Sequence, residues 1–206
     1  MSGTNEASDH YFSGDPSAPS HPRNFKFTHN EHELEIISDR GVFSYGALDL
    51  GTRVLLDTVP TPGVGLALDI GCGAGPIALA LATHGSVTGV YAVDTNTRAL
   101  VLTRSSASLN HLNNVTACLP DDVPVDLKFE TIWSNPPIRI GKEALHDLLD
   151  LWLPRLSESG ECWLVVQKNL GADSLQHWIH SRGFDVTRMA SRKGYRVFRV
   201  VHARNG

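Results

Sequence analysis

The fold of this chain is decided by LDIGCGAGP at residues 68–76, where an apolar strand runs directly into a glycine-rich turn. Glycines at alternate positions let the backbone turn tightly and approach a ligand closely, because no Cβ intervenes. A dinucleotide-binding fingerprint would have its third glycine at position 76, where this chain has Pro76. A P-loop would need a Lys-Ser/Thr pair, which the turn lacks. The turn therefore predicts a cofactor loop of another kind.

Around this turn, apolar strands alternate with helices from residue 64 onward. We expect strands at residues 66–70, 87–94, 115–119, 130–134, 162–166, 184–189 and 195–201, and helices at 76–83, 97–112, 142–156 and 173–181. This alternation predicts an α/β fold of the Rossmann-like type. Its sheet is expected to be seven-stranded and mostly parallel, with helices on both faces and an antiparallel strand at the end.

The sequence before residue 64 has a different pattern. Residues 1–23 are rich in Ser, Pro, Gly and Asp and are expected to form a flexible arm. Residues 24–63 are expected to form an N-terminal β-hairpin around Asn30 and an amphipathic helix at 48–59, both packed on the rest. Residues 64–206 are then the catalytic domain.

Composition excludes several classes of protein. The chain has 206 residues, 41% of them apolar, so it can bury a sizeable core. It has no run of about 18 apolar residues and no signal-type N-terminus, so we expect no membrane span and no signal peptide. Its three cysteines are too few and too scattered for a disulfide framework. These features are typical of a cytoplasmic enzyme, and we expect a monomer.

The net charge of −4 argues against a non-specific nucleic-acid binder, which needs many Lys and Arg side chains on phosphates. The charges are unevenly distributed, however. Residues 1–50 hold eight acidic and three basic side chains, whereas residues 182–206 hold seven basic side chains and one acidic side chain. The basic C-terminal segment therefore leaves a structured RNA site open as a partner.

Acidic residues follow the first three strands of the predicted sheet. Asp69 precedes the turn, and Asp94 ends the second strand. A carboxylate at that second position can accept hydrogen bonds from both ribose hydroxyls of a nucleotide. The alternative is that Asp94 only caps the helix starting near Thr97. Asp121 and Asp122 follow the third strand, either as further cofactor contacts or as two solvated loop acids.

The chemical signature is SNPPI at residues 134–138, directly after an apolar strand. Two prolines stiffen the backbone and remove both amide donors, which exposes carbonyl groups. The nitrogen of an aromatic amine or an amide is a poor nucleophile because its lone pair is delocalised. If Asn135 Oδ1 and the Pro136 carbonyl accept hydrogen bonds from an NH₂ group, they favour a pyramidal, correctly aimed nitrogen; good orientation is worth roughly 7–11 kcal/mol. The alternative is an ordinary Asn-Pro turn.

Three segments together resemble the small-domain family of class I methyltransferases, which use S-adenosylmethionine. They are SNPPIRIGK at residues 134–142, LDIGCGAGPIALALA at 68–82 and GVFSYGALDLGTRVLL at 41–56. Within the family, the chain is most similar to bacterial guanine-N2 methyltransferases of small-subunit (16S) ribosomal RNA. The resemblance implies a class I methyltransferase fold and a target nitrogen held by Asn135, Pro136 and Pro137.

The resemblance also assigns the rest of the site. The superfamily places a contact to the adenine amino group after the third strand, where this chain leaves Asp121 and Asp122 as alternatives. Phe43 and Ser44 are expected to border the pocket. The residues expected to contact S-adenosylmethionine are Asp69, Gly71, Cys72, Gly73, Gly75, Asp94, Asp121 and Asp122, although Cys72 fits a packing role better than a nucleophilic one.

One position departs from the family. Many amino-methyltransferases have an aromatic residue after the two prolines to stack on the base, whereas this chain has Ile138. Stacking on the base is then expected to be weaker or to come from Phe43, Tyr11 or Phe12.

Basic and imidazole side chains leave further alternatives. Arg139 and Lys142 flank the Asn-Pro-Pro turn and are expected to contact the substrate at RNA phosphates, with a solvated face as the alternative. His-x-x-His pairs at residues 29–32 and 177–180 lack thiolates or carboxylates in register, so we expect no metal.

The predicted reaction is transfer of a methyl group from S-adenosylmethionine to an exocyclic nucleobase amine, guanine N2 of 16S ribosomal RNA. The alternatives are adenine N6 or a protein glutamine as acceptor, or a non-catalytic RNA-binding assembly factor that keeps the fold.

Overall fold

A computed structural model describes residues 19–136 and 141–203. Most of the expected N-terminal arm, with Tyr11 and Phe12, lies outside the described residues, as do Pro137, Ile138 and Arg139. Within the described ranges, no helix combines the length and the apolar character needed to cross a membrane.

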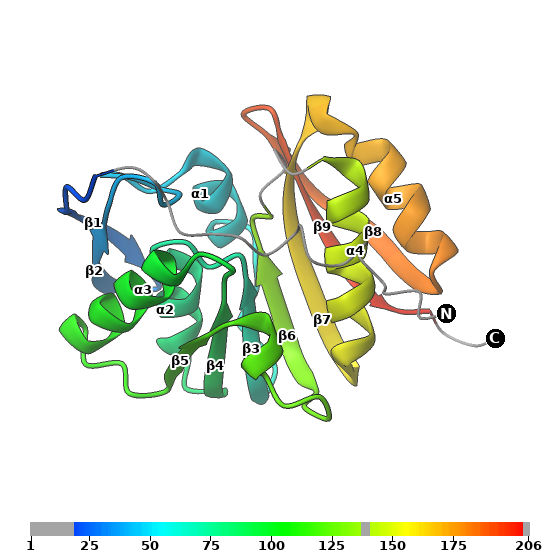
Figure 1. Cartoon of the computed structure of the whole chain (residues 1–206). Coiled ribbons are helices and arrows are strands. Elements are labelled where there is room, and N and C mark those ends of the chain that lie inside the picture. Colours follow the sequence, from blue (N-terminus) through cyan, green and yellow to red (C-terminus); the bar gives the residue numbers. More distant parts are fainter. Residues whose placement is uncertain (1–18, 137–140, 204–206) are drawn as a thin grey trace, which may run out of the picture.

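The centre of the protein is a seven-stranded sheet with the order β5-β4-β3-β6-β7-β9-β8, as Figure 1 shows. All neighbouring strands are parallel except that β9 is antiparallel to both β7 and β8. The predicted sheet is therefore confirmed. Its strands are β3 (Gly65–Ile70), β4 (Val87–Val93), β5 (Val115–Cys118), β6 (Phe129–Ser134), β7 (Leu156–Gln167), β8 (Phe184–Arg192) and β9 (Tyr195–His202).

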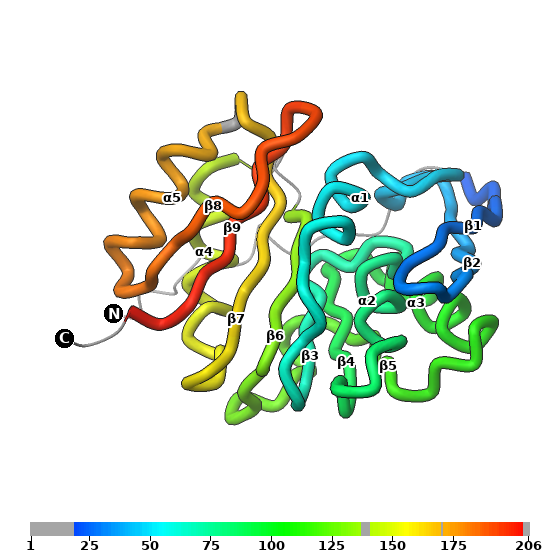
Figure 2. Tube along the Cα trace, turned by 180° about the vertical axis from the view of Figure 1, so that it is seen from behind, coloured from blue at the N-terminus to red at the C-terminus, as the bar shows by residue number. Residues whose placement is uncertain are grey.

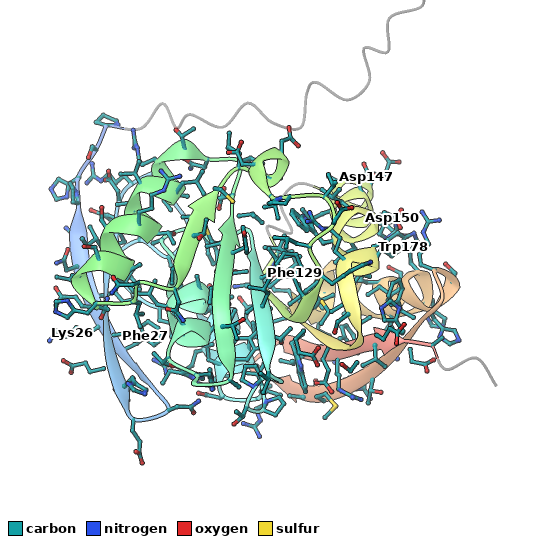
Figure 3. The ribbon with its side chains drawn as sticks, turned by 90° about the horizontal axis from the view of Figure 1, so that it is seen from below. Lys26, Phe27, Phe129, Asp147, Asp150 and Trp178 are labelled. Carbon is teal, nitrogen blue, oxygen red and sulfur yellow. The ribbon has the colours of Figure 1, made fainter. Side chains whose placement is uncertain are left out.

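Helices cover both faces of this sheet, and each face has its own apolar core. One core holds Trp133 and Trp163 together with residues of α1, α2 and α3; the other holds Ile132 and Leu164 together with residues of α4 and α5. Figure 3 shows Phe129, part of the second core, on the α4 side of the sheet. The helices are α1 (Leu50–Leu56), α2 (Pro76–Ala82), α3 (Thr97–Leu109), α4 (Lys142–Trp152) and α5 (Ala172–Ser181).

The helix expected at residues 142–156 is shorter in the structure. It ends at Trp152 and continues as a single 3₁₀ turn, Leu153–Arg155, after which β7 begins at Leu156. Pro154 has no amide hydrogen to donate to the helix, and it disfavours a helical conformation at the residue before it. β7 is in turn longer than the strand expected at 162–166.

The predicted N-terminal hairpin is confirmed as β1 (Arg23–His29) and β2 (His32–Ser38). Asn30 and Glu31 both have positive φ, which suits a two-residue hairpin turn. Neighbouring residues of β1 point to opposite faces, so Lys26 faces solvent and Phe27 is buried, as Figure 3 shows. Asn110, which ends α3, holds the outer edge of the hairpin, because its amide bonds both the N–H and the carbonyl of Glu35.

The hairpin meets the body of the protein at a pair of buried histidines. His29 Nε2 lies 3.3 Å from His84 Nε2, which precedes β4. Burial, followed by the neighbouring charges of His84 and Arg53, lowers the pKa of His29 to about 4, while the carboxylate of Asp57 raises it. Burial also lowers the pKa of His84. Both imidazoles are therefore neutral at pH 7.

This pair predicts an acid-sensitive fold. The unfolded chain binds a proton at position 29 near pH 6.5, but the folded chain binds it only near pH 4, so stability falls as the pH is lowered through that window. We expect a loss of about 2–3 kcal/mol from His29 at pH 4. The free energy of unfolding, measured by urea titration at several pH values between 7.5 and 4, tests this expectation. His29→Phe should lose stability less steeply, whereas the exposed control His111→Gln should follow the wild type.

Candidate active site

The switch point of the sheet lies between β3 and β6, because the chain runs from β3 outward to β5 and then returns to the other side of β3. Ile70 at the end of β3 is paired with Ser134 at the end of β6, and Ser134 Oγ donates a hydrogen bond of 2.7 Å to the Ile70 carbonyl. Ligands of open α/β sheets bind at this point. It carries the glycine turn after Ile70 and Asn135 after Ser134, so the two predicted motifs meet.

The glycine turn is held against the end of β4. The amides of Gly71 and Cys72 both donate to the carbonyl of Val93, at 2.8 and 3.0 Å. Gly75 has φ +90°, and a Cβ there would lie 2.9 Å from the side chain of Thr103 on α3. Only glycine fits that position, so the third glycine of the turn serves the packing of α2 against α3.

Asp94 connects β4 to the glycine turn. Its Oδ2 accepts from the Gly73 amide and its Oδ1 from the Asn96 amide, both at 2.9 Å. Asn96, rather than Asp94, caps α3, because Asn96 Oδ1 accepts from the amides of Arg98 and Ala99. The capping alternative for Asp94 is therefore wrong. Burial raises the pKa of the Asp94 carboxyl, although these backbone hydrogen bonds act against the increase.

Asp69 lies below the turn on the α2 side of the sheet. It is fully buried, and its Oδ2 accepts a 2.9 Å hydrogen bond from the Ala78 amide in the first turn of α2. Burial raises the pKa of this carboxyl well above its ordinary value. Asp69 thus ties α2 to β3. Its Oδ1 is buried and has no hydrogen-bond partner among the described residues.

Cys72 is a packing residue. Its Sγ is buried 3.5 Å from Thr103 Oγ1, and burial raises the pKa of the thiol well above its ordinary value. The reactive form of cysteine is the thiolate, so a nucleophilic role is excluded at neutral pH.

The loop at residues 41–46 packs against the glycine turn. A Cβ on Gly73 would lie 3.5 Å from both Phe43 Cβ and the Phe43 carbonyl. The Phe43 side chain is 54% exposed, an unusual placement for a large aromatic residue. Ser44 has φ +69°, and its buried Oγ has no partner within the described ranges. Phe43 therefore lies against the glycine turn, and Ser44 is its neighbour in the chain.

The amide of Asn135 has a fixed orientation. Its Nδ2 donates to Asp49 Oδ2 at 2.9 Å and to Thr52 Oγ1 at 3.0 Å. An ionised carboxylate only accepts hydrogen bonds, so the NH₂ end must face Asp49 and the oxygen end must point away from it. Among the described residues, Asn135 Oδ1 has no hydrogen-bond partner. Pro136, the next residue, is buried.

Asp49 and Thr52 join the candidate site through Asn135, and the sequence alone did not point to them. Asp49 caps α1 by accepting from the Thr52 amide, a local role that its position before a helix predicts. The contact with Asn135 spans more than 80 residues of sequence, and no local pattern encodes it.

The two acids after β5 differ in their contacts. They lie on the 3₁₀ turn Pro120–Asp122 and are both exposed. Asp122 Oδ2 accepts from the Leu119 amide at 3.3 Å, closing the turn. Asp121 has no hydrogen-bonded partner among the described residues and is the freer of the two.

The predicted basic contacts are only partly available. Lys142 is exposed at the start of α4, near the Asn-Pro turn. Several arginines of the C-terminal segment are already engaged by carboxylates. The ion pairs join Arg182 to Asp150, Arg196 to Asp173 and Arg199 to Glu161.

The two His-x-x-His pairs have other contacts in the structure. His177 and His180 contact backbone carbonyls, and His29 faces His84 rather than His32. Among residues 19–136 and 141–203, no group of three His, Cys, Asp or Glu side chains is arranged to hold a metal ion.

The strand order, the glycine turn and an Asn-Pro turn at the switch point define the class as Rossmann-like methyltransferases. Residues 33–199 match the family model of the methyltransferase small domain. The chain belongs to this family of S-adenosylmethionine-dependent methyltransferases.

Sequence relatives align with most of this chain. The chain is 35% identical over 197 residues to the uncharacterized Bacillus subtilis protein YbxB, covering 94% of this chain and 98% of that protein. It is 34% identical over 152 residues to ribosomal RNA small subunit methyltransferase C of Psychromonas ingrahamii, covering 71% of this chain but only 43% of that protein. It thus spans less than half of that enzyme's length.

The fold is shared with the Thermus thermophilus 16S rRNA N2 G1207 methyltransferase, solved with S-adenosylmethionine and guanosine. The TM-score is 0.74 at 22% identity, over 92% of this chain and 52% of that chain.

We expect Asp94 both to stabilise the glycine turn and to bind S-adenosylmethionine. Asp94→Ala leaves two partly buried amides without an acceptor, which should cost about 1–3 kcal/mol of unfolding free energy. It should also weaken binding of S-adenosylmethionine, measured by calorimetry. The control Asp122→Ala removes an exposed carboxylate and should change stability by no more than about 0.5 kcal/mol. Unchanged cofactor affinity in Asp94→Ala would contradict the assignment.

Proposed function

We propose that this protein methylates the exocyclic amine of a nucleobase, guanine N2 of 16S ribosomal RNA. The observation that carries the proposal is the orientation of Asn135, whose amide oxygen remains available beside the glycine turn. Relatives support the acceptor class, because ribosomal RNA small subunit methyltransferases align with most of this chain.

The cofactor fits the residues present. Ser44 Oγ beside the turn and Asp69 Oδ1 beneath it are buried polar atoms without a hydrogen-bond partner among the described residues, and such atoms normally have one. The Asp94 carboxylate accepts from the backbone amides of Gly73, Asn96 and Thr95 and still retains acceptor capacity, which suits a ribose hydroxyl. Asp121 is the better candidate for the adenine amino group, because Asp122 is bonded to Leu119.

S-adenosylmethionine supplies an electrophilic methyl group on its sulfonium. Asn135 Oδ1 and the Pro136 carbonyl accept the two N–H hydrogens of the target amine and hold its lone pair out of conjugation with the ring. The amine becomes acidic as it is methylated, so it releases a proton to solvent without a dedicated base. Phe43, which is exposed at the edge of the turn, offers the stacking surface that Ile138 does not.

Asp49 and Thr52 act through Asn135 as positioning residues. Together they occupy the NH₂ end of its amide and prevent the side chain from presenting a donor to the substrate amine. A protein glutamine or adenine N6 offers the same NH₂ chemistry. The choice of ribosomal RNA therefore rests on the relatives, and that of guanine N2 on the likeness to the Thermus thermophilus enzyme. Offering labelled cofactor to RNA, DNA and protein fractions separately, and identifying the methylated nucleoside in the RNA, decides between the acceptors.

Asn135→Ala should lower kcat on RNA by about 10²–10³-fold, the loss typical of removing one hydrogen-bonding group from a reacting centre. Binding of S-adenosylmethionine should stay within twofold by calorimetry, since Asn135 contacts the acceptor. The control is Asn114→Ala, a half-buried asparagine that bonds the Ala82 carbonyl away from the site. Equal turnover in Asn135→Ala would refute the mechanism.

Thr52→Val removes one of the two bonds to the Asn135 amide while keeping the shape of the side chain. The loss of one hydrogen bond should lower kcat two- to tenfold at an unchanged KM for RNA. Thr52→Ser should restore kcat, because it returns the hydroxyl. Thr58→Val provides the control, since Thr58 bonds the Val54 carbonyl at the other end of α1.

A further inference from the structure

We infer that the tip of the β8–β9 hairpin, defined as Arg192, Lys193 and Gly194, docks the RNA backbone beside the target nucleotide, together with Lys168. The inference rests on the proposed function, because it takes RNA as the substrate. It goes further by naming the protein surface that holds the RNA.

The charges of the tip are not ion-paired with described residues, unlike those of three other arginines in the basic C-terminal segment. Arg182, Arg196 and Arg199 are neutralised by carboxylates. Arg192, Lys193 and Lys168 are exposed, and none of them has a carboxylate within ion-pair distance among the described residues. Free cations are what an RNA backbone recognises, because neutralised phosphates release their counterions.

The tip is rigidly built. Lys193 and Gly194 have φ +51° and +82°, the two-residue turn that matches the twist of a hairpin. The Gly194 carbonyl accepts a 2.8 Å hydrogen bond from the Lys168 amide, which follows β7. The three cations are therefore fixed on one short stretch of surface and lose little conformational freedom at the backbone when they bind.

The tip stands at the same end of the sheet as the candidate active site. Figures 1 and 2 show it beside α1 from both sides. Tyr195 makes the connection, because a Cβ on Gly51 in the first turn of α1 would lie 2.7 Å from its Cε1. The Tyr195 hydroxyl also accepts a 3.0 Å hydrogen bond from Gln167 Nε2. α1 thus contacts Asn135 on one side and the hairpin on the other.

Strand register sets the spacing between the tip and Asn135. Leu164 of β7 is paired with Ser134, and Gln167 with Tyr195. The tip therefore extends about 10 Å beyond Ser134 along the strands and lies about 10 Å to the side, two strand spacings away. A strand of RNA whose base enters the site at Asn135 passes the tip within a few nucleotides.

The test uses the full chain and unmodified 16S ribosomal RNA transcribed in vitro. The variant is Arg192→Gln/Lys193→Asn, because asparagine tolerates the positive φ at position 193. Between 50 and 200 mM salt, the wild type should lose about tenfold more RNA affinity than the variant, the effect of two phosphate contacts. At low salt, the KM for RNA should rise about tenfold, while kcat at saturating RNA and cofactor affinity stay unchanged.

The matched control is Lys26→Gln/Lys128→Gln, which removes the same charge from two exposed lysines of the hairpin β1–β2 and the segment before β6. It should behave as the wild type. An equal loss of RNA affinity in both double variants would overturn the inference, because the affinity would then depend on the net charge of the protein rather than on the charges of the tip.

Binding and turnover separate the two proposals. If the wild type methylates RNA and the tip variant has unchanged affinity and KM, the tip inference is overturned and the proposed function stands. If the wild type methylates no RNA but binds it through the tip, with the expected salt dependence, the proposed function is wrong and the inference that the tip binds RNA is supported. Loss of methylation of a protein substrate in the tip variant, with RNA binding unaffected, would also overturn the RNA assignment.

Discussion

The site depends on one contact between neighbouring parallel strands, the pairing of Ile70 in β3 with Ser134 in β6, sealed by the hydroxyl of Ser134 on the Ile70 carbonyl. This pairing places the start of the glycine turn and the start of the Asn-Pro turn side by side at the switch point. The cores on the two faces of the sheet hold β6 in this register, because Ile132 is fully buried in one core and Trp133 in the other. A shift of one residue would exchange those faces and separate the two turns.

Two buried carboxylates show how the chain divides similar groups between scaffold and ligand. Asp69 accepts a hydrogen bond from α2, while Asp94 accepts from the glycine turn and from the start of the segment after β4, and its carboxylate retains acceptor capacity. Burial raises the pKa of both carboxyls. Neither is paired with a cation in the described part of the chain, so backbone amides alone offset their burial.

Helix α1 contacts both Asn135, the residue proposed to bind the target amine, and the β8–β9 hairpin, whose tip is proposed to bind RNA. Its cap residue Asp49 and its Thr52 hold the amide of Asn135, and its Gly51 lets Tyr195 of the β8–β9 hairpin pack closely. One short element thus sets the direction of the acceptor oxygen and the position of the basic tip. The segment outside the repeating α/β pattern is therefore part of the candidate site rather than an appendage to the fold.

The sequence by itself determined the sheet, the hairpin and both turns, because these follow from apolar periodicity, glycine and proline, which act locally. It also located Asp94, Phe43 and Asn135 near the site. Only the tertiary structure decided what these residues contact: Asn96 caps α3 in place of Asp94, and Asp49 and Thr52 orient Asn135. Likewise, the sequence showed the C-terminal segment only as uniformly basic, yet in the structure Arg182, Arg196 and Arg199 form ion pairs with distant acids, whereas Arg192 and Lys193 at the β8–β9 tip form none with the described residues. Hydrogen bonds and ion pairs between residues far apart in sequence leave no periodic signal, so they emerge only once the chain has folded.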